Sequence, residues 1–334
     1  MKNKYLLVVA GLLFLVSSCS INQFAVRIVA DALTSPGGGS VFMTDNDPEF
    51  IASALPFALK TFESLLQSDP DNIDLIEASA SGFVSYANGF LQSPAELLSY
   101  EQIEEKNSLL KRASAMYRRG GDYAFLGLKK LYPELYSDIS NGNYYVLADM
   151  NKDAVPFLYW KAAALMGEFS IDSFNPALMI KIPGAVAFAV RALELDENYN
   201  QGAIHNLFIS IFANLPESLI YRSLESDNDY SVREAFKAYY LTRGSLFGNM
   251  IVYDQALFHF DLSVKISRGS SVTPFVAISS LYINNQDIDS FKYILKKALE
   301  IDLNSNPDNM LQNIISQRKA EWLLDHIDDY FFIL

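Results

Sequence analysis

The chain has 334 residues, half of them hydrophobic, and a formal net charge of −13 at pH 7. A surface with this acidic excess repels phosphate backbones and anionic lipid headgroups, so the composition argues against a nucleic-acid-binding protein. The single cysteine excludes a disulfide within the chain, and packing alone must therefore stabilise the core.

The first 18 residues have the pattern of a bacterial export signal. Lys2 and Lys4 precede an uncharged apolar run from Tyr5 to Val16, which is too short to cross a bilayer. The Val-Ser-Ser-Cys that follows resembles the lipobox of bacterial lipoproteins. Cys19 is therefore predicted to carry lipid and to begin the mature chain, the alternative being a free cysteine in a discarded leader or a lone exported thiol. No later apolar run reaches about 20 residues, so the lipid is the predicted membrane contact.

Helical periodicity begins directly after the predicted cleavage site. Apolar residues from Ile21 to Leu33 follow the three-and-four spacing of one helix face, and residues 35–39 (SPGGG) then form a flexible connection. These glycines lack the Gly-Lys-Ser/Thr that completes a phosphate-binding loop. We expect residues 19–47 to form an N-terminal helix and this Gly-rich connection, within a single helical domain that covers residues 19–334.

Three segments of the chain share one plan, in which an apolar helix is followed by a turn of Asp, Asn and Pro and then by a second helix. They are residues 59–80, 186–207 and 292–314. The first helix is predicted to begin at Asp47-Pro48-Glu49, an N-cap followed by a proline in the first turn, and to end near Ser68. Because one hairpin cannot bury its own apolar face, neighbouring hairpins must stack on it.

The hairpin plan is similar to that of tetratricopeptide repeats, although the turns have no fixed period and the full Trp, Gly and Tyr pattern is missing. The predicted fold class is all-α, with tetratricopeptide-like hairpins stacked into an α-solenoid-like domain. Two stretches leave alternatives open. Gly120-Gly121 either breaks a helix or allows close packing, and residues 143–148 (NYYVLA) form either a strand or the start of a helix.

No motif for catalysis or metal binding is found. The three histidines, at 205, 259 and 326, are far apart in sequence, and no zinc-protease, nucleophile-elbow or dinucleotide-binding motif occurs. Acidic pairs such as Glu104-Glu105 lie in polar stretches typical of solvated surface. The sequence therefore predicts a protein without metal, cofactor or catalysis. An envelope hydrolase with a convergent acid/base site is a competing hypothesis.

Aromatic residues on the predicted helices are the better candidates for a binding site. Tyr159, Trp160 and Lys161 are consecutive, so they face different sides of one helix and at least one should reach an exposed groove. The alternative is that Trp160 packs between hairpins. Tyr86 belongs to the same candidate set for contact with a ligand or partner.

Two polar residues complete the candidate set. His205 follows a turn and begins a helix, where a capping or packing role is the default interpretation and ligand binding is the alternative. Asn313 lies on an otherwise apolar helix, so its side-chain amide must find partners within the protein or bind a ligand.

Several of these stretches resemble the T component (TatT) of tripartite ATP-independent periplasmic (TRAP) transporters. Besides the lipobox, the matching blocks are residues 58–91, 111–133, 156–167, 191–210, 258–269 and 306–331. One departure is a longer segment, residues 217–257, at a place where the family passes quickly from a proline-glycine turn into the next helix. An added helix there would alter a groove or a partner surface.

The resemblance implies a lipid-anchored accessory subunit that faces the periplasm. It also implies association with a periplasmic solute-binding protein, presentation of a small hydrophobic ligand to a membrane permease, and assembly into a homo-oligomer such as a trimer. A helical-repeat scaffold for cell-envelope assembly would have the same architecture, and it is the alternative function.

Overall fold

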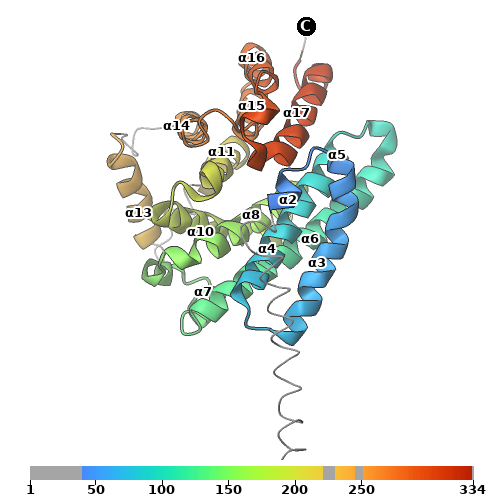
Figure 1. Ribbon diagram of the computed structural model, residues 1–334. Coiled ribbons are helices and arrows are strands. Elements are labelled where there is room, and N and C mark those ends of the chain that lie inside the picture. The colour runs from blue at the N-terminus through green and yellow to red at the C-terminus, as the bar shows by residue number, and fades with distance from the viewer. Residues whose placement is uncertain (1–39, 221–229, 245–250, 333–334) are drawn as a thin grey trace, which may run out of the picture.

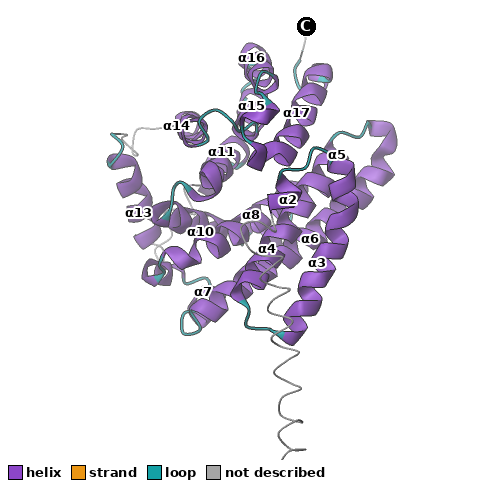
Figure 2. Ribbon diagram, viewed as in Figure 1, coloured by secondary structure: helices purple, strands orange, loops and turns teal. Residues whose placement is uncertain are grey.

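The structure, a computed structural model, describes residues 40–220, 230–244 and 251–332 (Figure 1). Within these ranges all regular elements are helices and no strand occurs, which confirms the predicted all-α fold class (Figure 2). Cys19, the predicted N-terminal helix and the Gly-rich connection lie outside the described residues.

The first hairpin forms where the sequence predicts it. After α2 (Ser40–Met43), α3 (Pro48–Ser68) and α4 (Ile73–Ala87) pack against each other. Asp47 caps α3 by accepting a hydrogen bond from the backbone N–H of Phe50 at 2.9 Å, and Asn72 caps α4 by accepting from Leu75 at 3.1 Å. Such caps satisfy backbone donors that a helix leaves unpaired at its start.

The longest helix of the described residues packs between two neighbours through its glycines. A π-helical turn, η1 (Asn88–Gln92), and two short helices, α5 (Ser93–Glu96) and η2 (Tyr100–Gln102), lead into α6 (Ile103–Leu131). A Cβ atom on Gly120 would lie 2.7 Å from Val84 of α4, and one on Gly121 would lie 3.0 Å from Ala164 of α8 (Val155–Ile171). The glycine pair therefore allows close packing and does not break the helix.

The strand alternative for residues 143–148 is wrong. Tyr144–Asp149 form a 3-10 helix, η3, between α7 (Tyr136–Ser140) and η4 (Lys152–Ala154). The ring of Tyr144 contacts Phe188 edge-on, with ring centroids 5.6 Å apart, so this segment packs on α10 (Ile182–Leu195).

The remaining helices form the second half of the molecule. In chain order they are α9 (Pro176–Met179), α10 (Ile182–Leu195), η5 (Tyr199–Gly202), α11 (Ala203–Asn214), α13 (Tyr230–Leu241), α14 (Val252–Ile266), α15 (Thr273–Asn284), α16 (Ile288–Leu299), η7 (Leu303–Ser305), η8 (Pro307–Asn309), α17 (Met310–Asp325) and η9 (Ile327–Asp329). The second predicted turn joins α10 to α11, and the third joins α16 to α17. Membership of the tetratricopeptide class and the single-domain boundaries stay predictions.

The last long helix packs against the beginning of the described chain. α17 contacts both α2 and α3, and Arg318 on α17 forms an ion pair with Glu49 in the first turn of α3. Lys319 pairs with Glu96 of α5. Segments more than 200 residues apart are therefore adjacent.

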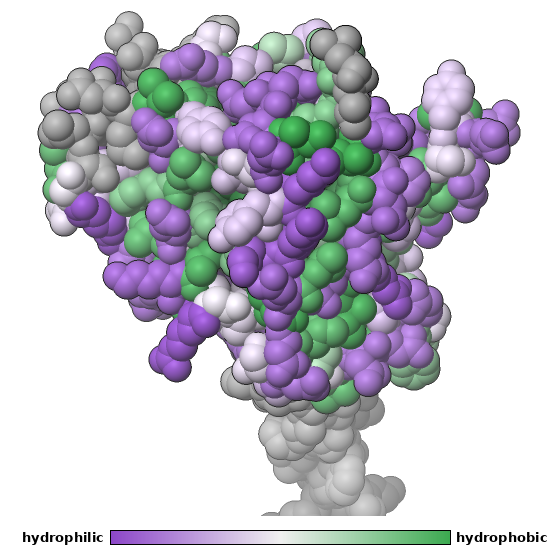
Figure 3. All heavy atoms as spheres, turned by 90° about the horizontal axis from the view of Figure 1, so that it is seen from above, coloured by the Kyte–Doolittle hydropathy of each residue, from purple (hydrophilic) through white to green (hydrophobic). Residues whose placement is uncertain are grey.

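Two apolar clusters fill the interior. The larger one contains residues from Leu66 to Phe331, and the smaller one surrounds Tyr117 between α4, α6 and α8. The face seen in Figure 3 carries hydrophilic residues interspersed with apolar patches. In the described residues, no helix combines the length and the apolar character that a membrane crossing requires.

Candidate functional site

Three aromatic side chains meet beside the first half of α8. The rings of Tyr159 and Trp160 are 4.8 Å apart between centroids and nearly perpendicular, at 69°. Tyr199 comes from η5, and its ring centroid lies 5.3 Å from that of Tyr159. The Trp160 indole donates a hydrogen bond to the Tyr199 hydroxyl. All three side chains are half-buried, so they are neither sealed in the core nor fully solvated.

The hydroxyls at this aromatic cluster stay protonated at neutral pH. Burial raises the pKa of Tyr159 to about 12. Burial, followed by the charge of Glu77, raises the pKa of Tyr199 further above its usual value. The pKa of Glu77 is itself raised, mainly by burial and then by Asp74. An apolar surface with hydroxyl donors suits a ligand that is mostly apolar and has one polar edge.

Tyr86 lies on the same part of the molecule. It packs against the smaller apolar cluster, as Trp160 also does, and its ring is 6.0 Å from that of Phe90. The structure therefore brings Tyr86, Tyr159 and Trp160 to the region where α4, α6 and α8 pack together. Whether these side chains contact a ligand stays a prediction.

A buried polar network underlies this region, and sequence reasoning missed it. The Tyr117 hydroxyl donates to Gln92 at 2.6 Å and accepts from Asn88 at 3.0 Å. Gln92 in turn donates to Glu96 at 2.8 Å and to Ser170 at 3.0 Å. Asn88 and Gln92 face α6 because η1 is a π-helical turn, and no residue pattern in the segment NGFLQ indicated that geometry.

His205 lies in the core and forms a pair with a second histidine. Its Nδ1 is 2.8 Å from Nδ1 of His259 on α14, and Nε2 of His259 is 2.8 Å from the Tyr240 hydroxyl on α13. Both imidazoles are fully buried. The two histidines are 54 positions apart in the sequence, which hid this contact from sequence reasoning, and a binding role for His205 stays a prediction.

Asn313 finds its partners within the protein. Its side-chain oxygen accepts from the backbone N–H of Val272 at 2.9 Å, and its amide donates to the carbonyl of Ser270 at 2.8 Å. The side chain is fully buried, so both polar ends are satisfied where water cannot reach. Asn313 therefore fixes the α14–α15 turn against α17.

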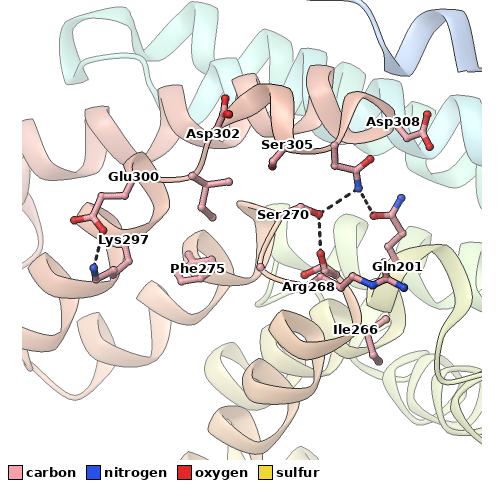
Figure 4. Close-up of a pocket in the computed structure, with 14 residues that line it drawn as sticks. Gln201, Ile266, Arg268, Ser270, Phe275, Lys297, Glu300, Asp302, Ser305 and Asp308 are labelled. Atoms are coloured by element: carbon pink, nitrogen blue, oxygen red, sulfur yellow. Dashed lines mark hydrogen bonds and ion pairs between the residues drawn. The ribbon is translucent and has the colours of Figure 1, made fainter.

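Next to this turn is an open cavity of about 880 Å³, which we call the turn groove (Figure 4). It is bounded by the α14–α15 turn (266–270) and by the α16–α17 connection (300–308). The Asn306 amide donates to Gln201 at 2.7 Å and to Ser270 at 3.2 Å, which joins three interhelical turns. Charged side chains of both signs line the groove: Arg268, Lys297, Glu300, Asp302 and Asp308. The groove suits a polar partner segment better than a small apolar ligand.

In residues 40–220, 230–244 and 251–332, no group of three or more His, Cys, Asp or Glu side chains is arranged to hold a metal ion. The aromatic cluster and the turn groove both present hydrogen-bonding and apolar groups. In class, the described part of the molecule is an all-helical protein.

The comparisons with known proteins specify this class further. The chain belongs to the TRAP transporter T-component family, whose model matches residues 44–220 and 217–331. The chain is also similar to an uncharacterized protein of Treponema pallidum (strain Nichols), with 29% identity over 295 residues, which cover 87% of this chain and 82% of the relative. Membership supports an accessory role in a TRAP transporter and points to the cell envelope.

Proposed function

We propose that this protein is a non-catalytic accessory subunit of a TRAP transporter, anchored by lipid at Cys19 and facing the periplasm. The observation that carries the proposal is the family match, which extends over residues 44–331. The export signal and the lipobox supply the route and the tether. Stable membrane attachment needs more than one acyl chain, because a single chain gives only marginal binding.

We propose further that the protein binds a periplasmic solute-binding protein. The turn groove supports this part of the proposal, because both acidic and basic side chains line it. A hydrogen bond from the Asn306 side-chain amide to Gln201 also holds its walls in place. Side chains held in place lose little conformational entropy when a partner binds. Charges of both signs also favour one orientation of the partner.

The proposed small ligand is mostly apolar and binds beside Tyr159 and Trp160. The half-buried rings provide apolar contact area, and the protonated hydroxyls of Tyr159 and Tyr199 provide directed donors. In the proposed role the subunit holds this ligand near the permease without changing it chemically.

The deciding experiment is a binding measurement between purified mature protein and the solute-binding protein recovered with it from its own envelope. Calorimetry should give a saturable, salt-sensitive interaction, because charged side chains line the turn groove. Charge reversal at Asp308 should weaken it, whereas charge reversal at Asp138 on α7, outside the groove, should not. Recovery of only envelope-assembly proteins, with no binding between the purified components, would favour the scaffold alternative.

Membrane attachment and self-association are tested separately. Cys19→Ser should move the protein from the membrane fraction to the soluble fraction, as cell fractionation would measure. The proposed homo-oligomer, a trimer, should appear in light scattering of the mature protein. A monomer at micromolar concentration would contradict that part.

A further inference from the structure

The buried histidine pair connects α13 to the rest of the protein. Tyr240 of α13 contacts His259 through its hydroxyl, at 2.8 Å from Nε2. Phe236 of α13 stacks on Phe208 of α11, with ring centroids 5.3 Å apart. α13 therefore rests on α11 and α14 through a set of aromatic contacts that surround two imidazoles, His205 and His259.

Both imidazoles are neutral in this arrangement. Burial lowers the pKa of His205 to about 4. Burial, and then the neighbouring His205, lower the pKa of His259 well below its usual range. Among the residues that the structure describes, none is a hydrogen-bond partner of His205 Nε2, so a doubly protonated His205 would place an unpaired charged N–H in the core.

The nearest charges belong to the cluster around Tyr239. Glu197 accepts the Tyr239 hydroxyl at 3.0 Å and forms an ion pair with Arg243, which lies over the Tyr239 ring. Glu197 favours a charged His205 and Arg243 opposes it, but burial is the largest effect. Both donors reach the same carboxylate oxygen, Oε2, and the charge of Glu197 offsets only part of the effect of burial on the pKa of His205.

Among the described helices, α15, α10 and α8 also pack on α11, and their charged side chains, where present, have partners of their own. α15 packs on both α11 and α14 and contains no acidic or basic residue. On α10, Arg191 and Glu194 pair with each other. On α8, Lys161 donates to the Gly121 carbonyl and Glu168 pairs with Arg118.

We propose that the His205–His259 pair is an acid-sensitive switch whose protonation detaches α13 and uncovers the aromatic surface of α11 and α14. α13 is the element expected to move, because α11 and α14 pack on each other and on α15, whereas α13 lies at the edge and packs on α10 and η3 (Figure 1). This inference is independent of the proposed transport role.

The pH window follows from the direction of the pKa shifts. An exposed histidine has a pKa near 6.5, so the detached state takes up protons more readily than the attached state as the pH falls below that value. The opening equilibrium therefore increases from about pH 6.5 downward and levels off below the pKa of the attached state. For His205 alone, with its pKa lowered to about 4, opening should increase by roughly 30-fold between pH 7.5 and pH 5.

Hydrogen–deuterium exchange of the mature, full-length protein at pH 7.5 and pH 5, corrected for the intrinsic pH dependence of exchange, tests this directly. Amides of α13 should lose protection at pH 5, whereas those of α6 and α8 should not. His205→Gln and His259→Gln cannot gain a charge and should remove most of the pH effect. His326→Gln, at an exposed histidine on the end of α17, is the matched control and should leave the effect unchanged.

If the glutamine variants fold poorly, the wild-type protein decides. Histidine-specific exchange of the imidazole C2 proton, followed by mass spectrometry, gives protonation midpoints for His205 and His259. These midpoints should coincide with the loss of α13 protection. The proposal is overturned by α13 protection that does not change with pH, by loss of protection that is uniform over the whole chain, or by midpoints separate from α13 opening.

Discussion

The two halves of the molecule bury polar groups in different ways. Beside α6, the Tyr117 hydroxyl both donates and accepts, and its partner Gln92 leads outward to Glu96 and Ser170. Beside α13, two neutral histidines share one hydrogen bond, and His205 Nε2 has no partner within the described part of the chain. The first network is satisfied at any pH near neutral. The second network depends on both rings remaining uncharged. Burial of polar groups therefore does not by itself make their contacts insensitive to pH.

The largest expected effect is in the α13 region. Phe236→Ala should lower the free energy that holds α13 in place by about 3–5 kcal/mol, because a fully buried ring is replaced by a cavity. Hydrogen exchange should show unprotected α13 amides and unchanged α6 amides. Equal loss of amide protection in α13 and α6 would mean that the two halves unfold as one unit, which would contradict the difference between them.

In the α6 region, close packing predicts that enlarging a glycine lowers the free energy of unfolding of the whole molecule. A Cβ atom on Gly127 would lie 2.3 Å from the ring of Phe157, which is itself fully buried. Gly127→Ala should therefore lower the free energy of unfolding by about 1–3 kcal/mol despite the better helix propensity of alanine. Gly89→Ala is the matched control, because its Cβ would meet Ile315 at an ordinary 3.5 Å. Denaturant titration of both variants measures the difference, and equal stabilities would contradict the packing argument.

Removing one hydroxyl tests whether the α6 network is as self-sufficient as its geometry indicates. Tyr117→Phe leaves Gln92 and Asn88 without their shared partner and should cost about 1–2 kcal/mol in free energy of unfolding. This cost should be the same at pH 7.5 and pH 5, in contrast to the α13 region. Tyr86→Phe, at a half-buried ring nearby, should cost less, and a pH-dependent cost for Tyr117→Phe would contradict the comparison.

The smallest expected effect is at a helix cap. Asn72→Ala removes the acceptor for the Leu75 backbone N–H and should lower the free energy of unfolding by about 1 kcal/mol, as thermal denaturation can measure. Asn72→Asp keeps an acceptor at the same position and should recover most of the loss. No recovery would mean that the cap is not the source of the stability.

The sequence predicts local features of this protein better than contacts between distant segments. The cap at Asp47 and the turn after Ser68 are encoded within a few residues, and both form as predicted. The His205–His259 contact depends on how α11 packs against α14, and no local pattern records that packing. α13 and its Tyr240 lie outside the motifs that carry the family resemblance, so those motifs did not indicate that Tyr240 contacts the pair.

The candidate site shows the same division. Tyr159 and Trp160 could be selected because they are consecutive on one predicted helix, and the structure places them in mutual contact. Tyr199 joins them only because η5 returns toward α8, and its turn contains two non-glycine residues with positive φ, Asn200 and Gln201. Left-handed backbone at such residues is uncommon, and composition does not predict it.

The ion pair between Arg318 and Glu49 has a consequence for biogenesis. Synthesis delivers α3 long before α17, so the surface of α3 that receives α17 remains uncovered until α17 is available. Contacts of such large sequence separation slow folding, because the intervening chain must first be ordered. Completion of the native state therefore awaits α17, and until then nascent molecules are the ones that chaperones and proteases are most able to engage.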